Sequence, residues 1–128
     1  MKTERWRHVA WAVCAAAVVL HVVTAFVMSA GPVGAFTLQL FVFSCLPYLA
    51  MFVLATSLKQ PIPGATGASA ALVADAAMFW SVFVQPKGST AALGLLFMPV
   101  WNLLAIAPAA AAMAFVVTRG LKRDSHLS

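Results

Sequence analysis

Four long apolar runs, separated by short segments rich in proline and glycine, constrain this chain more than any other feature of its sequence. The runs cover about residues 9–29, 36–56, 69–85 and 91–118. A helix that crosses the hydrocarbon core of a bilayer needs about 20 mainly apolar residues, and the runs are near or above that length. The sequence therefore predicts an all-α, polytopic integral membrane protein with four transmembrane helices.

The composition agrees with this class, since 63% of the residues are hydrophobic, 9% are charged and the mean hydropathy is +0.97. These values exclude an ordinary water-soluble domain. The breaks between the runs lie at residues 31–34, 59–67 and 86–88, and Ser89 and Thr90 are placed to cap the fourth helix. Such short connections favour an antiparallel bundle that forms one domain over residues 1–128. The fourth run is long enough that it should tilt or kink.

The basic residues predict how the helices are oriented. Seven of the eight Lys and Arg residues fall at the two termini or in the middle connection, and Lys87 alone falls on the other side. The positive-inside rule then predicts that both termini are cytoplasmic, in a multi-pass protein of the cell inner (plasma) membrane. A cleaved signal peptide is the competing interpretation of residues 1–30, but Met28-Ser29-Ala30 is a poor cleavage site, so we expect the first helix to be retained.

One acidic residue, Asp75, lies inside the third apolar run of a chain that contains three acidic residues in total. An intramembrane carboxyl is expensive and marks a functional site by default. Counted from the outer ends of their helices, Asp75, His21, Cys45 and Asn102 lie about 9 to 12 residues deep, or roughly 14–18 Å at helical rise. Tyr48 lies slightly deeper. We therefore expect Asp75 to find a hydrogen-bond donor in Asn102, His21 or Tyr48.

Helical spacing places these residues on narrow stripes of small or polar side chains, which are expected to face inward. The stripes are Cys14, Ala17, His21, Thr24 and Met28 on the first helix, Thr37, Phe41, Ser44, Tyr48 and Met51 on the second, and Ala68, Ala71, Leu72, Asp75, Met78 and Phe79 on the third. The many alanines allow helices to approach closely.

Three roles remain open for Asp75. It could hold the bundle together through an interhelical hydrogen bond, act as the site of a proton relay or transporter, or face a partner chain. The carboxyl either keeps its proton or is paired with a cationic His21, and the sequence leaves both states open. Pro47, Pro99 and Pro108 interrupt the apolar runs, either as simple kinks or as positions that free carbonyl groups for an ion path.

Recognisable enzyme and cofactor chemistry is missing from the sequence. There is no G-x-S-x-G motif, no glycine-rich phosphate loop and no cluster of metal-ligating spacing. Cys14 and Cys45 are read as two small buried hydrophobes, or as a disulfide if their helices touch at matching depth. His21 alone lies at a depth that suits a haem ligand. We therefore expect no enzyme activity, catalytic residue, metal, cofactor or nucleic-acid partner.

The function that follows is a non-enzymatic membrane protein that acts by helix association, such as an accessory subunit or a toxin-immunity partner. Its expected partners are the lipid bilayer and either another membrane protein or a second copy of itself. The alternative is a small oligomeric transporter or channel that uses Asp75 as its proton or cation site. A lipid- or quinone-handling subunit is a third hypothesis, which rests on the apolar bundle and His21.

Overall fold

The computed structural model describes residues 2–27, 34–84 and 91–127, and almost all of them are helical. The helical elements are α1 (Lys2–Val22), η1 (Val23–Val27), α2 (Ala35–Thr56), α3 (Pro61–Phe79), η2 (Trp80–Val84), α4 (Ala91–Trp101), η3 (Asn102–Ile106) and α5 (Ala107–Leu127). The three η elements are π-helical segments that continue a preceding α-helix. The all-α prediction is confirmed for the described residues.

Four helices are long and apolar enough to cross a membrane: Thr3–Val27, Ala35–Thr56, Pro61–Val84 and Phe97–Leu127. This confirms the four predicted spans at the level of length and composition. The first and last helices are longer than the apolar runs, because the charged residues at both ends of the chain continue the helix. Lys, Arg and Glu are good helix formers and need no apolar surroundings to stay helical.

The predicted connection over residues 59–67 is wrong in extent, because α3 begins at Pro61 instead of near residue 69. Proline is favoured in the first turn of a helix, where its missing N–H would have no partner in any case. The observed connection is shorter and turns at Lys59, which adopts a left-handed conformation with φ of 54°. The N–H of Gly64 donates to the carbonyl of Gln60 at 3.0 Å, so the helix is established from its first turn. The predicted breaks at residues 31–33 and 86–88, and the predicted caps Ser89 and Thr90, lie outside the described residues.

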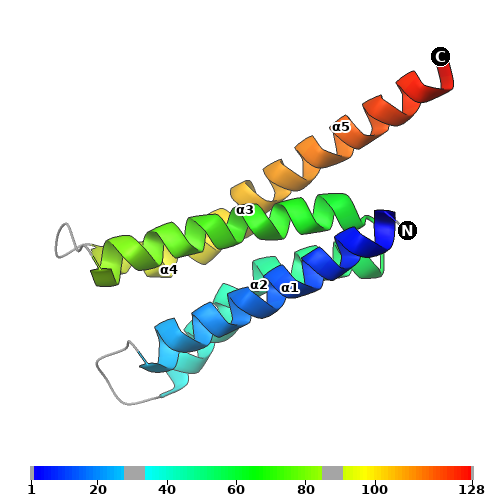
Figure 1. Cartoon of the computed structure of the whole chain (residues 1–128). Helices are drawn as coiled ribbons and strands as arrows, with labels where there is room; N and C mark the ends of the chain where they lie inside the picture. The colour runs from blue at the N-terminus through cyan, green and yellow to red at the C-terminus, as the bar shows by residue number, and fades with distance from the viewer. Residues whose placement is uncertain (1, 28–33, 85–90, 128) are drawn as a thin grey trace.

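Helix α3 is central to the arrangement, because it packs against α1, α2 and α5. Figure 1 shows α1 and α2 side by side below α3, with α4 behind α3 and α5 diverging from α3 towards the C-terminus. The first turn of α1 and the last turn of α5 lie on the same side of the view, and the ends of η1 and η2 lie on the opposite side. We call these the terminal side and the opposite side of the bundle.

The fourth span is irregular, as its length predicted. Its π-helical segment η3 lies between Pro99 and Pro108 and begins at Asn102. Each proline lacks a backbone donor, so the regular pattern of helical hydrogen bonds cannot continue through this stretch. Pro47, by contrast, is accommodated inside an unbroken α2.

Small side chains form the core of the bundle. Its main cluster of buried residues is Ala17, Tyr48, Met51, Ala68, Ala71, Ala107 and Ala111. Glycine extends this close packing on α3. A Cβ atom added to Gly67 would lie 2.9 Å from the carbonyl oxygen of Ala107 and would overlap Met51, while one added to Gly64 would lie 2.7 Å from the Cβ of Ala55. Helices α2, α3 and α5 can therefore approach more closely than larger residues would allow.

Candidate functional site

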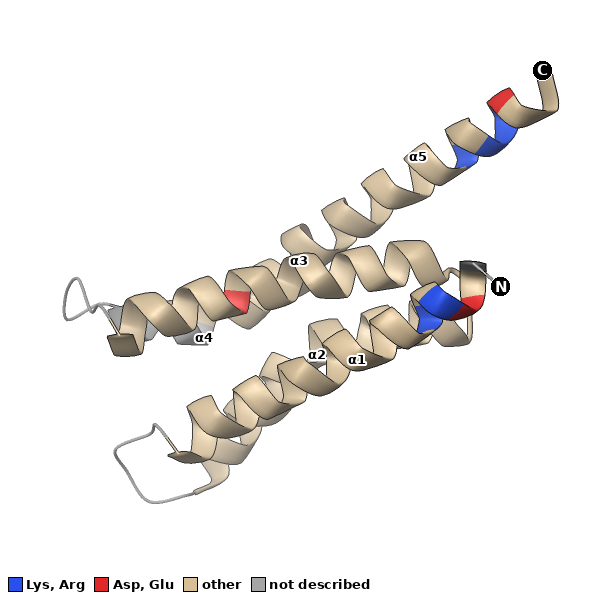
Figure 2. Ribbon diagram, in the orientation of Figure 1, with Lys and Arg blue, Asp and Glu red and all other residues tan. Residues whose placement is uncertain are grey.

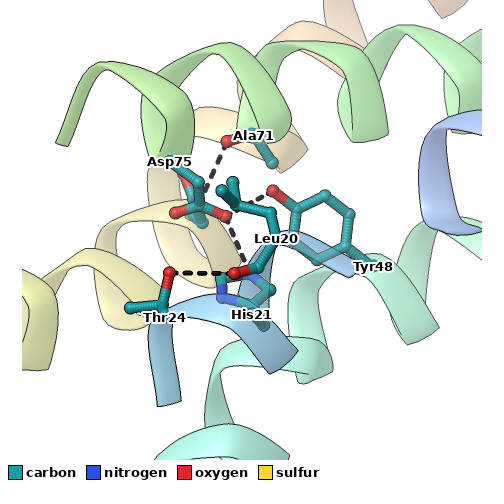
Figure 3. Close-up of polar contacts among 7 residues, drawn as sticks. Leu20, His21, Thr24, Tyr48, Ala71 and Asp75 are labelled. Carbon is teal, nitrogen blue, oxygen red and sulfur yellow. Dashed lines mark hydrogen bonds and ion pairs between the residues drawn. The ribbon is translucent and has the colours of Figure 1, made fainter. Parts of the chain in front are cut away.

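The carboxyl group of Asp75 is bound by side chains from three other helical elements. The Tyr48 hydroxyl on α2 donates a hydrogen bond to Oδ2 of Asp75, and Nε2 of His21 on α1 lies 3.1 Å from the same oxygen. The other carboxyl oxygen, Oδ1, accepts a hydrogen bond from Nδ2 of Asn102 on η3 at 2.7 Å. Figure 3 shows the His21 and Tyr48 side chains converging on Asp75. We call these four residues the Asp75 network.

Local helix geometry aims each donor at the carboxyl. His21 lies in the last turn of α1, and Tyr48 follows Pro47 in the middle of α2. Asn102 is the first residue of η3, where the altered helical pitch after Pro99 changes the direction in which its side chain points. Its Nδ2 atom also lies 3.4 Å from the carbonyl oxygen of Ala71, one turn before Asp75 on α3.

The network is buried. Asn102 is 0%, Tyr48 2%, Asp75 6% and His21 8% exposed. A carboxyl group withdrawn from water is costly unless its oxygens accept hydrogen bonds, and here both oxygens do. The lysines and arginines of the described residues lie towards the helix ends, whereas Asp75 lies part-way along α3 (Figure 2). His21 is therefore the group that can carry a positive charge beside Asp75.

The Tyr48 hydroxyl and the Asn102 amide nitrogen donate to Asp75, and His21 does so as well when its Nε2 atom carries a hydrogen. Such an arrangement stabilises negative charge on the carboxyl and leaves little room for a metal cation, which would need oxygen lone pairs. The Oδ1 atom of Asn102 is buried and has no hydrogen-bond partner among the described residues.

The sequence offered Asn102, His21 and Tyr48 as alternative donors, and the structure brings all three to Asp75 at once. The predicted inward stripes are confirmed in part. Their buried residues are Ala17, His21, Ser44, Tyr48, Met51, Ala68, Ala71 and Asp75, whereas Cys14, Thr24, Thr37, Phe41, Leu72, Met78 and Phe79 are partly exposed. What periodicity alone could not show is that three helices supply one donor each. That outcome depends on how the helices rotate about their axes when they pack.

The two cysteines are close to the network but are not part of it. Both are free thiols, so the disulfide alternative is not realised in this structure. The Cys14 thiol donates to the backbone carbonyl of Tyr48 at 3.6 Å and so helps to hold α1 against α2. Cys45, which shares the predicted depth of Asp75, is half-buried and lines an apolar groove between α1 and α2.

A small cavity of about 30 Å³ adjoins the network and was not predicted. His21 and Asp75 contribute to its wall, together with two further hydroxyl residues, Thr24 and Ser44. Ser44 is buried, and its hydroxyl makes no hydrogen bond within the described part of the chain, whereas the Thr24 hydroxyl donates to the carbonyl of Leu20 at 2.9 Å. Thr24 lies three residues after His21 and Ser44 four residues before Tyr48, so helical spacing was the signal that could have identified both.

No three His, Cys, Asp or Glu side chains lie together in residues 2–27, 34–84 and 91–127 in a way that could hold a metal ion. Comparisons of the chain with protein-family models, with curated proteins and with solved structures found no match. A function is therefore inferred from the residues of this chain.

Proposed function

We propose that this chain is a small, non-enzymatic integral membrane protein that acts through helix association in the bilayer. In this proposal the four helices form an antiparallel bundle in the inner membrane with both termini in the cytoplasm. The Asp75 network holds the bundle together, and the outer surface is offered to a membrane protein partner, as an accessory subunit or a toxin-immunity protein would do.

The observation that carries the proposal is that both oxygens of the buried carboxyl accept hydrogen bonds from other helical elements of the same chain. Three donors from α1, α2 and η3 bind Asp75 within the monomer. A carboxyl that serves to bind a transported cation would instead keep lone pairs available, with other oxygen ligands around it. A carboxyl bound by side chains from three other helical elements favours a role in holding the four segments together.

The distribution of large apolar side chains supports the same proposal. The core consists mainly of alanine, while many larger residues face outward, and Val19, Leu104 and Met113 are 63%, 73% and 69% exposed. In a bilayer such side chains contact lipid or another transmembrane helix, since the hydrophobic effect does not drive them inward. The described connection between α2 and α3 spans residues 57–60 only.

The proposed topology rests on charge. Arg5 and Arg7 lie in α1 at the terminal side, and Arg119, Lys122 and Arg123 lie in α5 towards the same side (Figure 2). Lys59 lies in the connection between α2 and α3. The positive-inside rule makes this side cytoplasmic. A test is labelling of single cysteines introduced at Ser57 and at Gly34 with a membrane-impermeant reagent in intact cells, in a chain that lacks Cys14 and Cys45. Labelling at Ser57 but not at Gly34 would contradict the proposed topology.

Proton flux distinguishes the proposal from the alternative. We expect proteoliposomes of the full chain to show no more proton flux across the membrane than protein-free vesicles, because the carboxyl is held by side chains from three other helical elements. The conservative variant Asp75→Asn should insert and behave as the wild type, since an amide can still hydrogen-bond. Flux in the wild type that Asp75→Asn abolishes would overturn the helix-association proposal.

The alternative, a small oligomeric proton- or cation-coupled transporter or channel that uses Asp75, is favoured by the cavity beside the carboxyl. The donors around Asp75 make a proton a better candidate for the transported species than a metal cation. Transport additionally requires that the carboxyl can be reached from both sides of the membrane. The flux measurement above separates the two functions.

A further inference from the structure

The bundle differs on the two sides of the Asp75 network. On the terminal side, one turn from His21, Asp75 and Tyr48, lie Ala17, Ala71 and Met51, which are all buried and belong to the same cluster. Ala107, five residues after Asn102, is also fully buried in this cluster. We call this part of the bundle the terminal half.

The other part, which we call the cavity half, contains the 30 Å³ cavity. Apart from Leu20, which directly precedes His21, every lining residue either belongs to the network or lies beyond it, away from the terminal side. The lining residues are Leu20, His21, Thr24, Ala25, Leu40, Phe41, Ser44, Asp75, Met78, Phe79, Met98 and Pro99. Most of the larger ones are partly exposed, so the cavity lies near the molecular surface.

The cavity is lined mainly by apolar side chains, with His21, Thr24, Ser44 and Asp75 as its polar residues. A cavity holds a water molecule when it offers roughly 10–15 Å³ and two or more hydrogen-bonding partners, so 30 Å³ beside these polar groups is enough for about two molecules. The Ser44 hydroxyl supplies a hydrogen-bonding group with no protein partner within the described residues. Asp75 and His21 supply further polar groups in the same wall.

We infer that this cavity is an internal water site through which the Asp75–His21 pair exchanges protons with the opposite side of the membrane only. A hydronium ion that reaches the cavity gives a proton to the pair and leaves as water, so that the pair gains one positive charge. Loss of that proton to a cavity water reverses the change. In the terminal half, by contrast, Ala17, Ala71 and Met51 are buried one turn from His21, Asp75 and Tyr48, so packed side chains separate the pair from that side.

The groups that face the pair can be named for each packed element. Helix α1 contributes His21 itself and, more distantly, Cys14. Helix α2 contributes Tyr48 and the half-buried Cys45, and η3 contributes the uncharged Asn102. The lysines and arginines of the described residues lie towards the helix ends (Figure 2), so the proton change is assigned to the Asp75–His21 pair alone.

The proposed proton exchange does not depend on which partner covers the outer surface. It differs from transport because protons reach the Asp75–His21 pair from one side of the membrane only. A one-sided acid step tests it. The full chain with a C-terminal affinity tag is reconstituted in proteoliposomes, and the tag separates vesicles whose termini face outward from those whose termini face inward. The outside is then acidified while a pH dye reports that the lumen stays buffered.

The readout is the infrared band of the Asp75 carboxyl, identified as the difference between wild type and Asp75→Asn. We expect the band to respond promptly in vesicles whose termini face inward, and about tenfold more slowly or not at all in the others, as closed packing slows access. Equal rates in both populations, a faster response from the terminal side, or no response in either would overturn the inference.

Filling the cavity provides a second test that does not need oriented vesicles. Ser44→Leu places a larger apolar side chain in the cavity and leaves the four network residues intact, and Thr24→Leu fills it from α1. When nanodiscs are transferred from H2O to D2O, hydrogen–deuterium exchange of the network side chains should slow by about tenfold in either variant that keeps its helical circular dichroism. The reason is that the filled cavity no longer brings water to the carboxyl. The matched control is Val42→Leu on the exposed face of α2, which should exchange as the wild type does. Unchanged exchange in a folded, cavity-filled variant would overturn the inference.

Discussion

The terminal half and the cavity half of the bundle use the same four helices but pack them by different means. In the terminal half, alanine and glycine let the backbones approach until a single added carbon atom has no space. In the cavity half, longer and flexible side chains such as Met78 and Met98 surround a small space that polar groups of the network also reach. The Asp75 network lies at the boundary. The comparison indicates that small residues fix the helix positions on one side, while polar groups can reach water on the other.

The largest effect should come from removing the carboxyl at the boundary. Asp75→Leu leaves the Tyr48 hydroxyl, a His21 nitrogen and the Asn102 amide buried without their acceptor, which should lower the free energy of unfolding by more than about 3 kcal/mol. Reversible unfolding in mixed detergent micelles measures this change. Asp75→Asn is the control and should lose only about 1 kcal/mol, because an amide still accepts a hydrogen bond. A leucine variant as stable as the wild type would mean that the network does not hold the two halves together.

The next largest effect is expected from a glycine-to-alanine substitution, which can be compared between the two halves. A Cβ at Gly67 would meet the rigid backbone oxygen of Ala107 at 2.9 Å, whereas a Cβ at Gly94 would meet only the end of the Met78 side chain, at 2.7 Å from its sulfur. Gly67→Ala should therefore lower the free energy of unfolding by about 2 kcal/mol. Gly94→Ala should be near neutral, because Met78 can move and alanine is a better helix former by about 1 kcal/mol. Equal losses in the same unfolding assay would show that the halves are equally rigid.

A smaller effect is expected from removing one donor. Tyr48→Phe deletes the hydroxyl that binds Oδ2 of Asp75 and should cost about 1 kcal/mol, since His21 continues to bind the same oxygen. In a double-mutant cycle with Asp75→Asn, most of this loss in the free energy of unfolding should appear as coupling energy between the two residues. Additive effects of the two substitutions would indicate that Tyr48 and Asp75 are independent in the folded protein.

The smallest effect belongs to the cavity half. Ser44→Ala removes a hydroxyl that has no hydrogen bond within the described residues, so the free energy of unfolding should change by less than about 0.5 kcal/mol. The companion change Ala17→Ser adds a hydroxyl to the terminal half, where it would be buried, and should cost about 1–2 kcal/mol. A loss at Ser44 as large as that at Ala17 would remove the distinction between the halves.

The fold could largely be predicted from the sequence, because length and hydropathy determine which segments can cross a bilayer. The start of the third helix could not, since Pro61, Pro63 and Gly64 have the composition of a connection. Proline is tolerated in a first helical turn, and glycine here permits close packing against Ala55. The π-helical segments η1 and η2 have no signal in the sequence that we can identify.

The site was predictable in its members but not in its arrangement. Depth and helical spacing indicated that His21, Tyr48, Asp75 and Asn102 share one layer. Whether one donor or three would reach the carboxyl depends on helix rotation and on the irregular segment that begins at Asn102. The cavity depends on how side chains from four helices leave space between them, so it could be found only in three dimensions.

The most direct test of the central claim is the infrared spectrum of the Asp75 carboxyl in nanodiscs, recorded as wild type minus Asp75→Asn. The same difference is measured in the backgrounds Tyr48→Phe, His21→Leu and Asn102→Leu, each checked for helical circular dichroism. If one carboxyl is bound by donors from three helical elements, each of the three substitutions shifts the band, because each removes one of its hydrogen bonds. If one of the three substitutions leaves the band unchanged, the account is contradicted, since that donor would then not reach Asp75 in the membrane.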